Sequence, residues 1–215
     1  QDVEEDSTRA FKLFLRAANA GDDEAILSVG MMYFKGEGVE RDLNEAFAWN
    51  LRAAELDNVT AMINTAYCYT YGEGVGKNVP KAIEWLNRAN DACDGKNADA
   101  LFELAKIYHE GDGVAQDNRK AFELMKASAE LGDSKAMTNT AYCYRCGDGV
   151  EKNLGKAVEW YNKALEASDG KDATALFVLS IMYDDGEGVA KDERRSFELC
   201  KKAAELGNVE AMSLL

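Results

Sequence analysis

The sequence predicts an all-α fold in which pairs of antiparallel helices repeat along the chain. Two observations predict it. A Gly-x-Gly-Val turn returns five times, 36 or 39 residues apart, beginning at Gly36, Gly72, Gly111, Gly147 and Gly186. Between these turns, apolar residues recur with the 3.6-residue period of an α-helix. A fixed period of this length is typical of an open array of small units, not of a single globular core.

The repetition has two levels. The segment Ala61–Lys135 matches the segment Ala136–Glu210, so a 75-residue double repeat contains two single units. We expect one array with units at 23–58, 59–97, 98–133, 134–172 and 173–208, and partial units at 1–22 and 209–215. Neither end has the polar outer face that caps such arrays, which favours a fragment of a longer protein.

The first helix of each unit is predicted by one apolar stripe. In the first full unit it comprises Ala25, Val29, Met32 and Tyr33, and the later units repeat these offsets of four, seven and eight. The stripe predicts first helices near residues 25–35, 61–71, 100–110, 136–146 and 175–185.

The second helix of each unit follows the glycine turn and opens with an Asx residue. Such a side chain accepts hydrogen bonds from the free N–H groups of a helix's first turn. In the five full units the Asx residue is Asp42, Asn78, Asp117, Asn153 and Asp192. Second helices are therefore expected near 43–56, 79–91, 118–131, 154–166 and 193–206. A stripe of alanines and tryptophans predicts burial of Trp85 and Trp160, and left-handed Gly132 and Gly207 are expected to end two of these helices.

These marks resemble the Sel1-like repeat family, relatives of the tetratricopeptide repeats. Ala25–Val39 follows the pattern Ala-x-x-x-Leu-Gly-x-x-Tyr-x-x-Gly-x-Gly-Val, with Val29 in place of Leu. Asp42–Ala54 follows Asp-x-x-x-Ala-x-x-Trp-x-x-x-Ala-Ala. The resemblance covers nearly the whole chain and implies a right-handed α-solenoid that usually serves as a protein-binding adaptor. Some cysteine-rich bacterial members staple each helix pair with a disulfide at a seven-residue gap, a spacing absent here.

Charge and cysteine content narrow the class of partner and compartment. The net charge of −14 opposes binding to nucleic acid or to an anionic membrane. No apolar run approaches the roughly 18 residues of a membrane span, so we expect no membrane insertion. The odd set of five cysteines shows no pairing pattern. A reducing compartment such as the cytoplasm is favoured, and a secreted or periplasmic location stays open.

Candidate chemistry in the sequence is weak. Ser168-Asp169-Gly170-Lys171 has the form Ser-x-x-Lys, but its repeat copy has Cys93 in place of the serine. His109 is the only histidine, and no second Cys or His pair accompanies Cys143 and Cys146. We therefore expect no enzymatic activity, no cofactor and no metal site.

The predicted binding surface is a concave groove lined by the first helices. Counting from the alanine that opens each stripe, the third, seventh and tenth positions lie off the stripe and are often apolar or aromatic, as exposed partner-binding surfaces are. Asn64 and Asn139 are expected to fix a peptide backbone through paired amide hydrogen bonds. The predicted partner-binding residues are Ile63, Asn64, Tyr67, Phe102, Lys106, His109, Asn139, Tyr142, Arg145, Phe177 and Ile181. The alternative, that these side chains pack between adjacent first helices, stays open.

Three classes of function follow from this sequence. The first is a non-catalytic adaptor that binds a protein or peptide ligand, with basic residues around an apolar anchor. The second is a structural array in which chains associate end to end. The third, by analogy with the cysteine-rich relatives, is a hydrolase or an antibiotic-binding protein.

Overall fold

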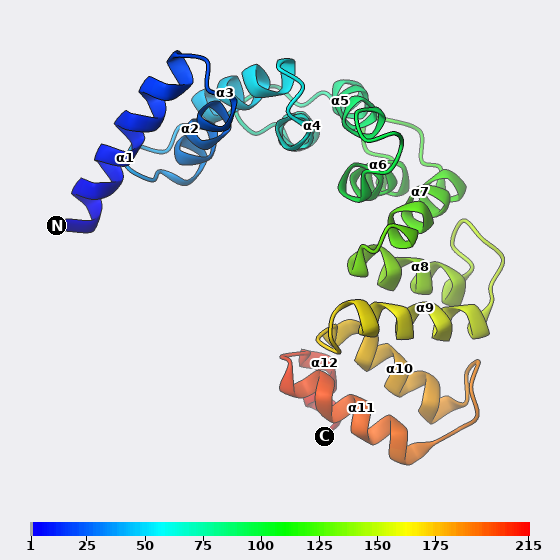
Figure 1. Cartoon of the computed structure of the whole chain (residues 1–215). Coiled ribbons are helices and arrows are strands. Elements are labelled where there is room, and N and C mark those ends of the chain that lie inside the picture. Colours follow the sequence, from blue (N-terminus) through cyan, green and yellow to red (C-terminus); the bar gives the residue numbers. More distant parts are fainter. Residues whose placement is uncertain (1) are drawn as a thin grey trace. The chain divides into compact units, whose positions relative to one another are not determined.

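The computed structural model describes residues 2–215, with side chains from Asp6 onward; Gln1, the first residue of the predicted partial unit 1–22, lies outside the described residues. Between residues 2 and 215 the chain forms twelve helices and no strand (Figure 1). The predicted all-α solenoid of helix pairs is confirmed. Contacts group the chain into two compact units. Unit 1 comprises residues 1–100 and 112–114, and unit 2 comprises residues 101–111 and 115–215.

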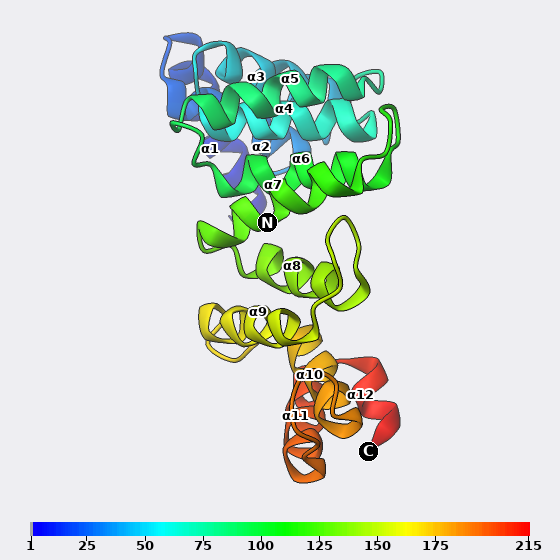
Figure 2. The same cartoon turned by 90° about the vertical axis from the view of Figure 1, so that its right-hand side faces the viewer.

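Each unit is a succession of antiparallel helices joined by short turns. Unit 1 contains α1 (Asp2–Asn19), α2 (Asp23–Lys35), α3 (Leu43–Glu55), α4 (Val59–Tyr71) and α5 (Val79–Asp91), whose stacking is visible in Figure 2. Most of α6 (Ala98–Glu110) belongs to unit 2, together with α7 (Asn118–Glu130), α8 (Ser134–Cys146), α9 (Leu154–Ala167), α10 (Ala173–Asp185), α11 (Glu193–Glu205) and α12 (Val209–Leu214). The even-numbered elements are the predicted first helices, and the odd-numbered elements are the second helices.

All ten predicted helices are present; four second helices end one residue from the predicted position, and the larger differences lie at the starts of the first helices. Each begins two residues before the predicted start because an Asx cap precedes it, a signal that the sequence reading missed. Asp22 Oδ1, for example, accepts from the backbone N–H of Ala25 at 2.8 Å, and Asn58 Oδ1 accepts from that of Ala61 at 2.9 Å. The predicted caps of the second helices are confirmed: Asp42, Asn78, Asp117, Asn153 and Asp192.

The glycine turn joins each helix pair to the pair before it. Gly72 ends α4 in the left-handed conformation, with φ of 77°, and its N–H donates to the Cys68 carbonyl. Gly74 lies directly against the first turn of α3, where a Cβ atom would overlap the carbonyl of Leu43. Gly149 makes the same approach to Asn118 at the start of α7. The second glycine of the turn is therefore required for two reasons. Its backbone packs closely against the second helix of the preceding pair, and its φ is positive, at 69° in Gly74.

The buried stripe of the second helices is wider than predicted. Trp160 is buried as expected, with 8% of its surface exposed. The prediction for Trp85 is wrong: its ring is only half-buried, and the guanidinium of Arg88 covers it at 4.4 Å from the ring centroid. The position after each tryptophan is more deeply buried, as Leu86 and Tyr161 show at 1% exposure each. A second helix packed between two first helices therefore buries one more position than the predicted stripe contains.

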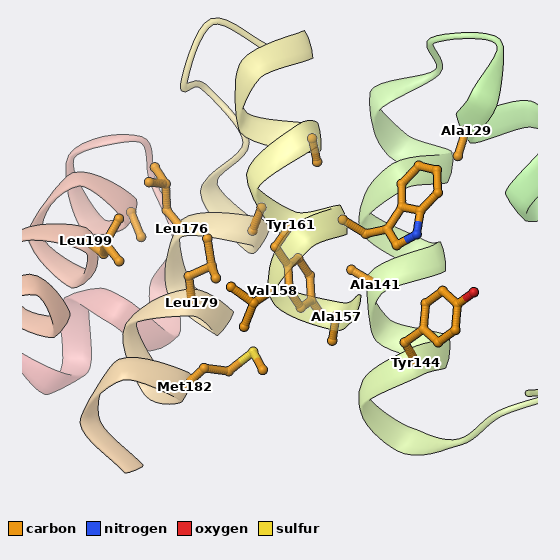
Figure 3. Close-up of a cluster of buried hydrophobic side chains, with 14 of the residues drawn as sticks. Ala129, Ala141, Tyr144, Ala157, Val158, Tyr161, Leu176, Leu179, Met182 and Leu199 are labelled. Carbon is orange, nitrogen blue, oxygen red and sulfur yellow. The ribbon is translucent and has the colours of Figure 1, made fainter. Parts of the chain in front are cut away.

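The core of unit 2 shows how small and large side chains alternate. Tyr161 and Val158 of α9 extend toward Leu176, Leu179 and Met182 of α10 (Figure 3). Alanines at the helix contacts, such as Ala141 and Ala157, let the helix axes approach closely. Gly132 and Gly207 adopt positive φ angles of 102° and 90° at the ends of α7 and α11, as predicted.

Candidate functional site

The first helices of unit 1 carry an exposed apolar surface. Met31 and Phe34 of α2 and Tyr67 and Tyr71 of α4 each expose between 37% and 44% of their area. The rings of Tyr67 and Tyr71 are tilted against each other, with centroids 4.5 Å apart. We call these four residues the unit 1 patch. Large apolar side chains gathered in this way mark binding surfaces more often than scattered ones do.

A cavity of about 270 Å³ opens within this patch. Met31, Phe34 and Tyr67 line it from the patch, and Asn64 and Cys68 of α4 line it further along. Asn50 of the second helix α3 completes the lining although only 5% of its surface is exposed. The Nδ2 group of Asn64 donates to Oδ1 of Asn50 at 3.4 Å, so the two amides are held together in the cavity wall.

The wall of this cavity carries no charge at neutral pH. Its lining contains no acidic or basic side chain. Burial, together with the nearby carboxylate of Glu73, raises the pKa of the Cys68 thiol to about 11, so the thiol stays protonated. The cavity is therefore suited to an uncharged group that combines apolar surface with hydrogen-bonding atoms.

The corresponding surface of unit 2 is polar and ion-paired. Lys106 Nζ lies 2.9 Å from Glu103, and Nδ1 of His109 lies 3.5 Å from Asp148. Arg145 Nε lies 3.6 Å from Glu187. These basic side chains contact acidic residues of unit 2 itself, two of which, Asp148 and Glu187, belong to the glycine turns. Tyr142, with 50% of its surface exposed, is the large aromatic exception on α8.

The remaining predicted residues have different surroundings. Phe102 and Phe177 are half-buried and pack against the core of unit 2, as in the packing alternative. Ile181 lines a cavity of about 340 Å³ beside Phe197 and Cys200. Asn139 is exposed and donates to the carbonyl of Lys135 in its own helix at 2.9 Å, so it is not arranged as Asn64 is. Ile63 is half-buried on α4 outside the lining of the unit 1 cavity.

The structure thus brings together only part of the predicted set. Asn64 and Tyr67 share one cavity in unit 1, whereas Phe102, Lys106, His109, Asn139, Tyr142, Arg145, Phe177 and Ile181 are distributed over the first helices of unit 2. The sequence reading missed Asn50. A signal was present, because the equivalent positions in the other second helices hold apolar residues or cysteine.

Other kinds of site have little support in the described chain. From Asp6 onward, where the structure describes the side chains, no group of three or more His, Cys, Asp or Glu residues could hold a metal ion. None of the described helices is long and apolar enough to cross a membrane. Ser168 of the Ser-x-x-Lys sequence donates to the carbonyl of Leu165 at 3.3 Å.

Comparison with known families gives one family for nearly the whole chain. The Sel1 repeat model matches residues 1–22, 23–58, 59–92, 98–133, 134–169 and 173–208. No curated protein matches the chain closely enough to count as a relative.

Solved structures with the same fold come from several bacteria. A Sel1 repeat protein from Oxalobacter formigenes is 29% identical over 95% of this chain and 88% of its own, with a TM-score of 0.79. The protective antigen c5321 of uropathogenic Escherichia coli is 31% identical over 95% of this chain, with a TM-score of 0.85. This chain spans 42% of that antigen's length. An immunity protein of Pseudomonas aeruginosa, Pa5087, is 20% identical over 94% of this chain and 75% of its own, with a TM-score of 0.57, and shows the shared fold alone.

Proposed function

This chain belongs to the Sel1 repeat family, and we propose that it is a non-catalytic protein-interaction module whose first helices bind a peptide or helix of a partner protein. Sel1 repeats are scaffolds that commonly serve protein interaction. The observation that carries the proposal is the unit 1 patch, in which three of the four large apolar residues line a side-chain-sized cavity. Rigid aromatic side chains bury much area at little cost in conformational entropy, so they dominate binding energies.

The charge of the chain adds a preference to this proposal. With a net charge of −14, the protein attracts a partner that carries basic residues around an apolar anchor. Such attraction raises the association rate, and salt screens it over about 8 Å at physiological ionic strength. The apolar anchor supplies the part of the affinity that persists at high salt.

The experiment compares two double variants of the full chain. Met31→Ala with Tyr67→Ala removes two residues of the unit 1 patch, and the control, Asn87→Ala with Lys201→Ala, changes two exposed residues of second helices. The immobilised proteins are incubated with an extract of the source cells, and bound partners are quantified by mass spectrometry. We expect the patch variant to lose at least about tenfold of the bound partner, as for hot-spot residues worth about 2 kcal/mol each.

Two further measurements make the result decisive. Melting temperatures should change little in either variant because the altered side chains are exposed. Sedimentation at several concentrations separates partner binding from association of the chain with itself. Equal retention of partners by the patch variant and the control would contradict the proposal.

A further inference from the structure

Asn50 is an exception among the second helices. It is buried to 95% of its surface, and the equivalent residues in the other copies are Phe14, Leu86, Met125, Tyr161 and Cys200. A polar side chain at this depth loses its hydration and destabilises the fold unless hydrogen bonds replace the lost water. An apolar residue works at this position elsewhere in the same chain, so the core itself does not require an asparagine.

The hydrogen bonding of Asn50 is incomplete within the described chain. Its Oδ1 accepts from Asn64 Nδ2 at 3.4 Å, the side-chain contact that the two amides share. An amide group has two N–H donors and a carbonyl acceptor with two lone pairs. The pair therefore leaves the N–H groups of Asn50 and the carbonyl of Asn64 available in the cavity wall. The backbone of α2 closes one side, since a Cβ atom on Gly30 would lie 3.5 Å from Asn50 Cγ.

A donor and an acceptor held side by side match a group that offers both together, as another amide does. A carboxamide can accept from an N–H of Asn50 and donate to the carbonyl of Asn64 at the same time, so both amides gain a partner. The rim of the cavity is formed by Met31, Phe34 and Tyr67, so the arriving amide needs an apolar stem to pass them. The volume of about 270 Å³ is below the 300–1,000 Å³ of typical small-molecule sites, which favours a single side chain as occupant.

We propose that the unit 1 cavity binds the carboxamide side chain of a glutamine in the partner's peptide, with Asn50 and Asn64 pairing its amide. This inference rests on the proposed function and names the side chain that the binding surface selects. A leucine or methionine in the same place offers no acceptor to the N–H groups of Asn50. A glutamate brings a negative charge to a lining that contains no basic side chain.

The test selects peptides against two forms of the full chain, the wild type and Asn50→Met. Methionine is the residue that α7 carries at this position, as Met125, so the variant has an apolar core that the fold already uses. A phage-displayed library of random peptides is selected against each form. We expect the wild type to enrich peptides that share a glutamine beside apolar or basic residues, and the variant to lose that preference.

Synthetic versions of an enriched peptide then measure the selectivity directly. Replacing its glutamine by glutamate, lysine or methionine should weaken binding to the wild type at least about tenfold, because buried amides are left unpaired. Against Asn50→Met, the glutamine and methionine peptides should bind within about threefold of each other. Asn87→Met, on the exposed face of α5, is the matched control and should retain the wild-type selectivity.

Thermal unfolding separates a binding role of Asn50 from a structural one. Asn50→Met should melt at or above the wild-type temperature, because it replaces a buried amide with an apolar side chain. A lower melting temperature would show that Asn50 is a structural residue and would overturn the inference. Enriched peptides without glutamine, or equal selectivity in Asn50→Met, would overturn it while leaving the proposed function intact. Enrichment of no peptide by either form would contradict both.

Discussion

The first-helix surfaces of unit 1 and unit 2 share one backbone design and differ in chemistry. The turns, the caps and the buried alanines recur in both units. Unit 1 presents Met31 and Phe34 where the double repeat places Lys106 and His109 in unit 2. In unit 2 basic side chains on this surface contact turn carboxylates, whereas in unit 1 apolar side chains line a cavity. A repeat scaffold therefore lets the surface change while the core stays constant.

One turn carboxylate has hydrogen-bond partners in unit 2 and lacks them in the described part of unit 1. Asp148 in unit 2 accepts from Asn118 Nδ2 at 2.6 Å and lies near His109. Its equivalent in unit 1 is Glu73, whose Oε2 atom is buried without a hydrogen-bond partner in the described chain. The residues that would serve it are Leu43 and Phe34, the equivalents of Asn118 and His109. Unit 1 thus gives up a stabilising contact for an apolar surface, as binding sites often do.

The largest expected difference between the units concerns their tryptophans. Trp160→Ala should lower the free energy of unfolding by about 3–5 kcal/mol because the buried ring leaves a cavity in the unit 2 core. Trp85→Ala should cost clearly less, since solvent and the Arg88 side chain already cover part of that ring. Urea unfolding of both variants measures the difference. Equal costs would show that the two positions are packed alike.

A smaller effect is expected where unit 1 is given the ion pair of unit 2. Phe34→Arg should provide Glu73 with the cation that Arg145 provides for Glu187, and should raise the free energy of unfolding by up to about 1 kcal/mol. Partner binding should weaken in the same variant because the patch loses an aromatic ring. The control is Phe34→Met, which brings no charge. A gain that persists in 1 M salt would rule out an ion pair as its cause.

The smallest effect is expected from the thiols, which should behave alike in both units. Burial raises the pKa of Cys68 and of Cys143 to about 11 from the ordinary value of 9. The folded state therefore holds these protons more tightly, so this contribution to stability is complete below pH 9 and is lost as the pH rises toward 11. Cys68→Ile with Cys143→Ile, which copies Ile107 of α6, should unfold with a weaker dependence on pH in that range. An unchanged dependence would show that the thiols are not desolvated.

Periodicity and turn chemistry made most of this fold predictable. The helices, the caps of the second helices and the left-handed Gly132 follow from patterns that each unit repeats. The start of each first helix was misplaced because its Asx cap lies outside the apolar stripe. Trp85 was misjudged because a one-dimensional stripe does not show how many neighbours a side chain has in space.

The candidate site was harder to predict for a physical reason. Repeats reveal what is common to the units, whereas a binding site depends on what departs from them. Asn64 and Tyr67 could be predicted because they lie on the first-helix surface. Asn50 was missed because it lies on the second helix α3 and lines the cavity from there. The useful signal was that Asn50 is polar where the equivalent residues are Leu86, Met125 and Tyr161.

The close approach of Gly74 to the Leu43 carbonyl also bears on how such chains lengthen. Each helix pair contains both halves of this contact. Its turn glycine packs against the pair before it, and the start of its second helix receives the turn glycine of the pair after it. A duplicated stretch of the gene therefore encodes the residues that pack the new helix pair against its neighbour on either side. Growth by copying requires no new packing solution, and each new copy adds surface residues that are free to diverge toward another ligand.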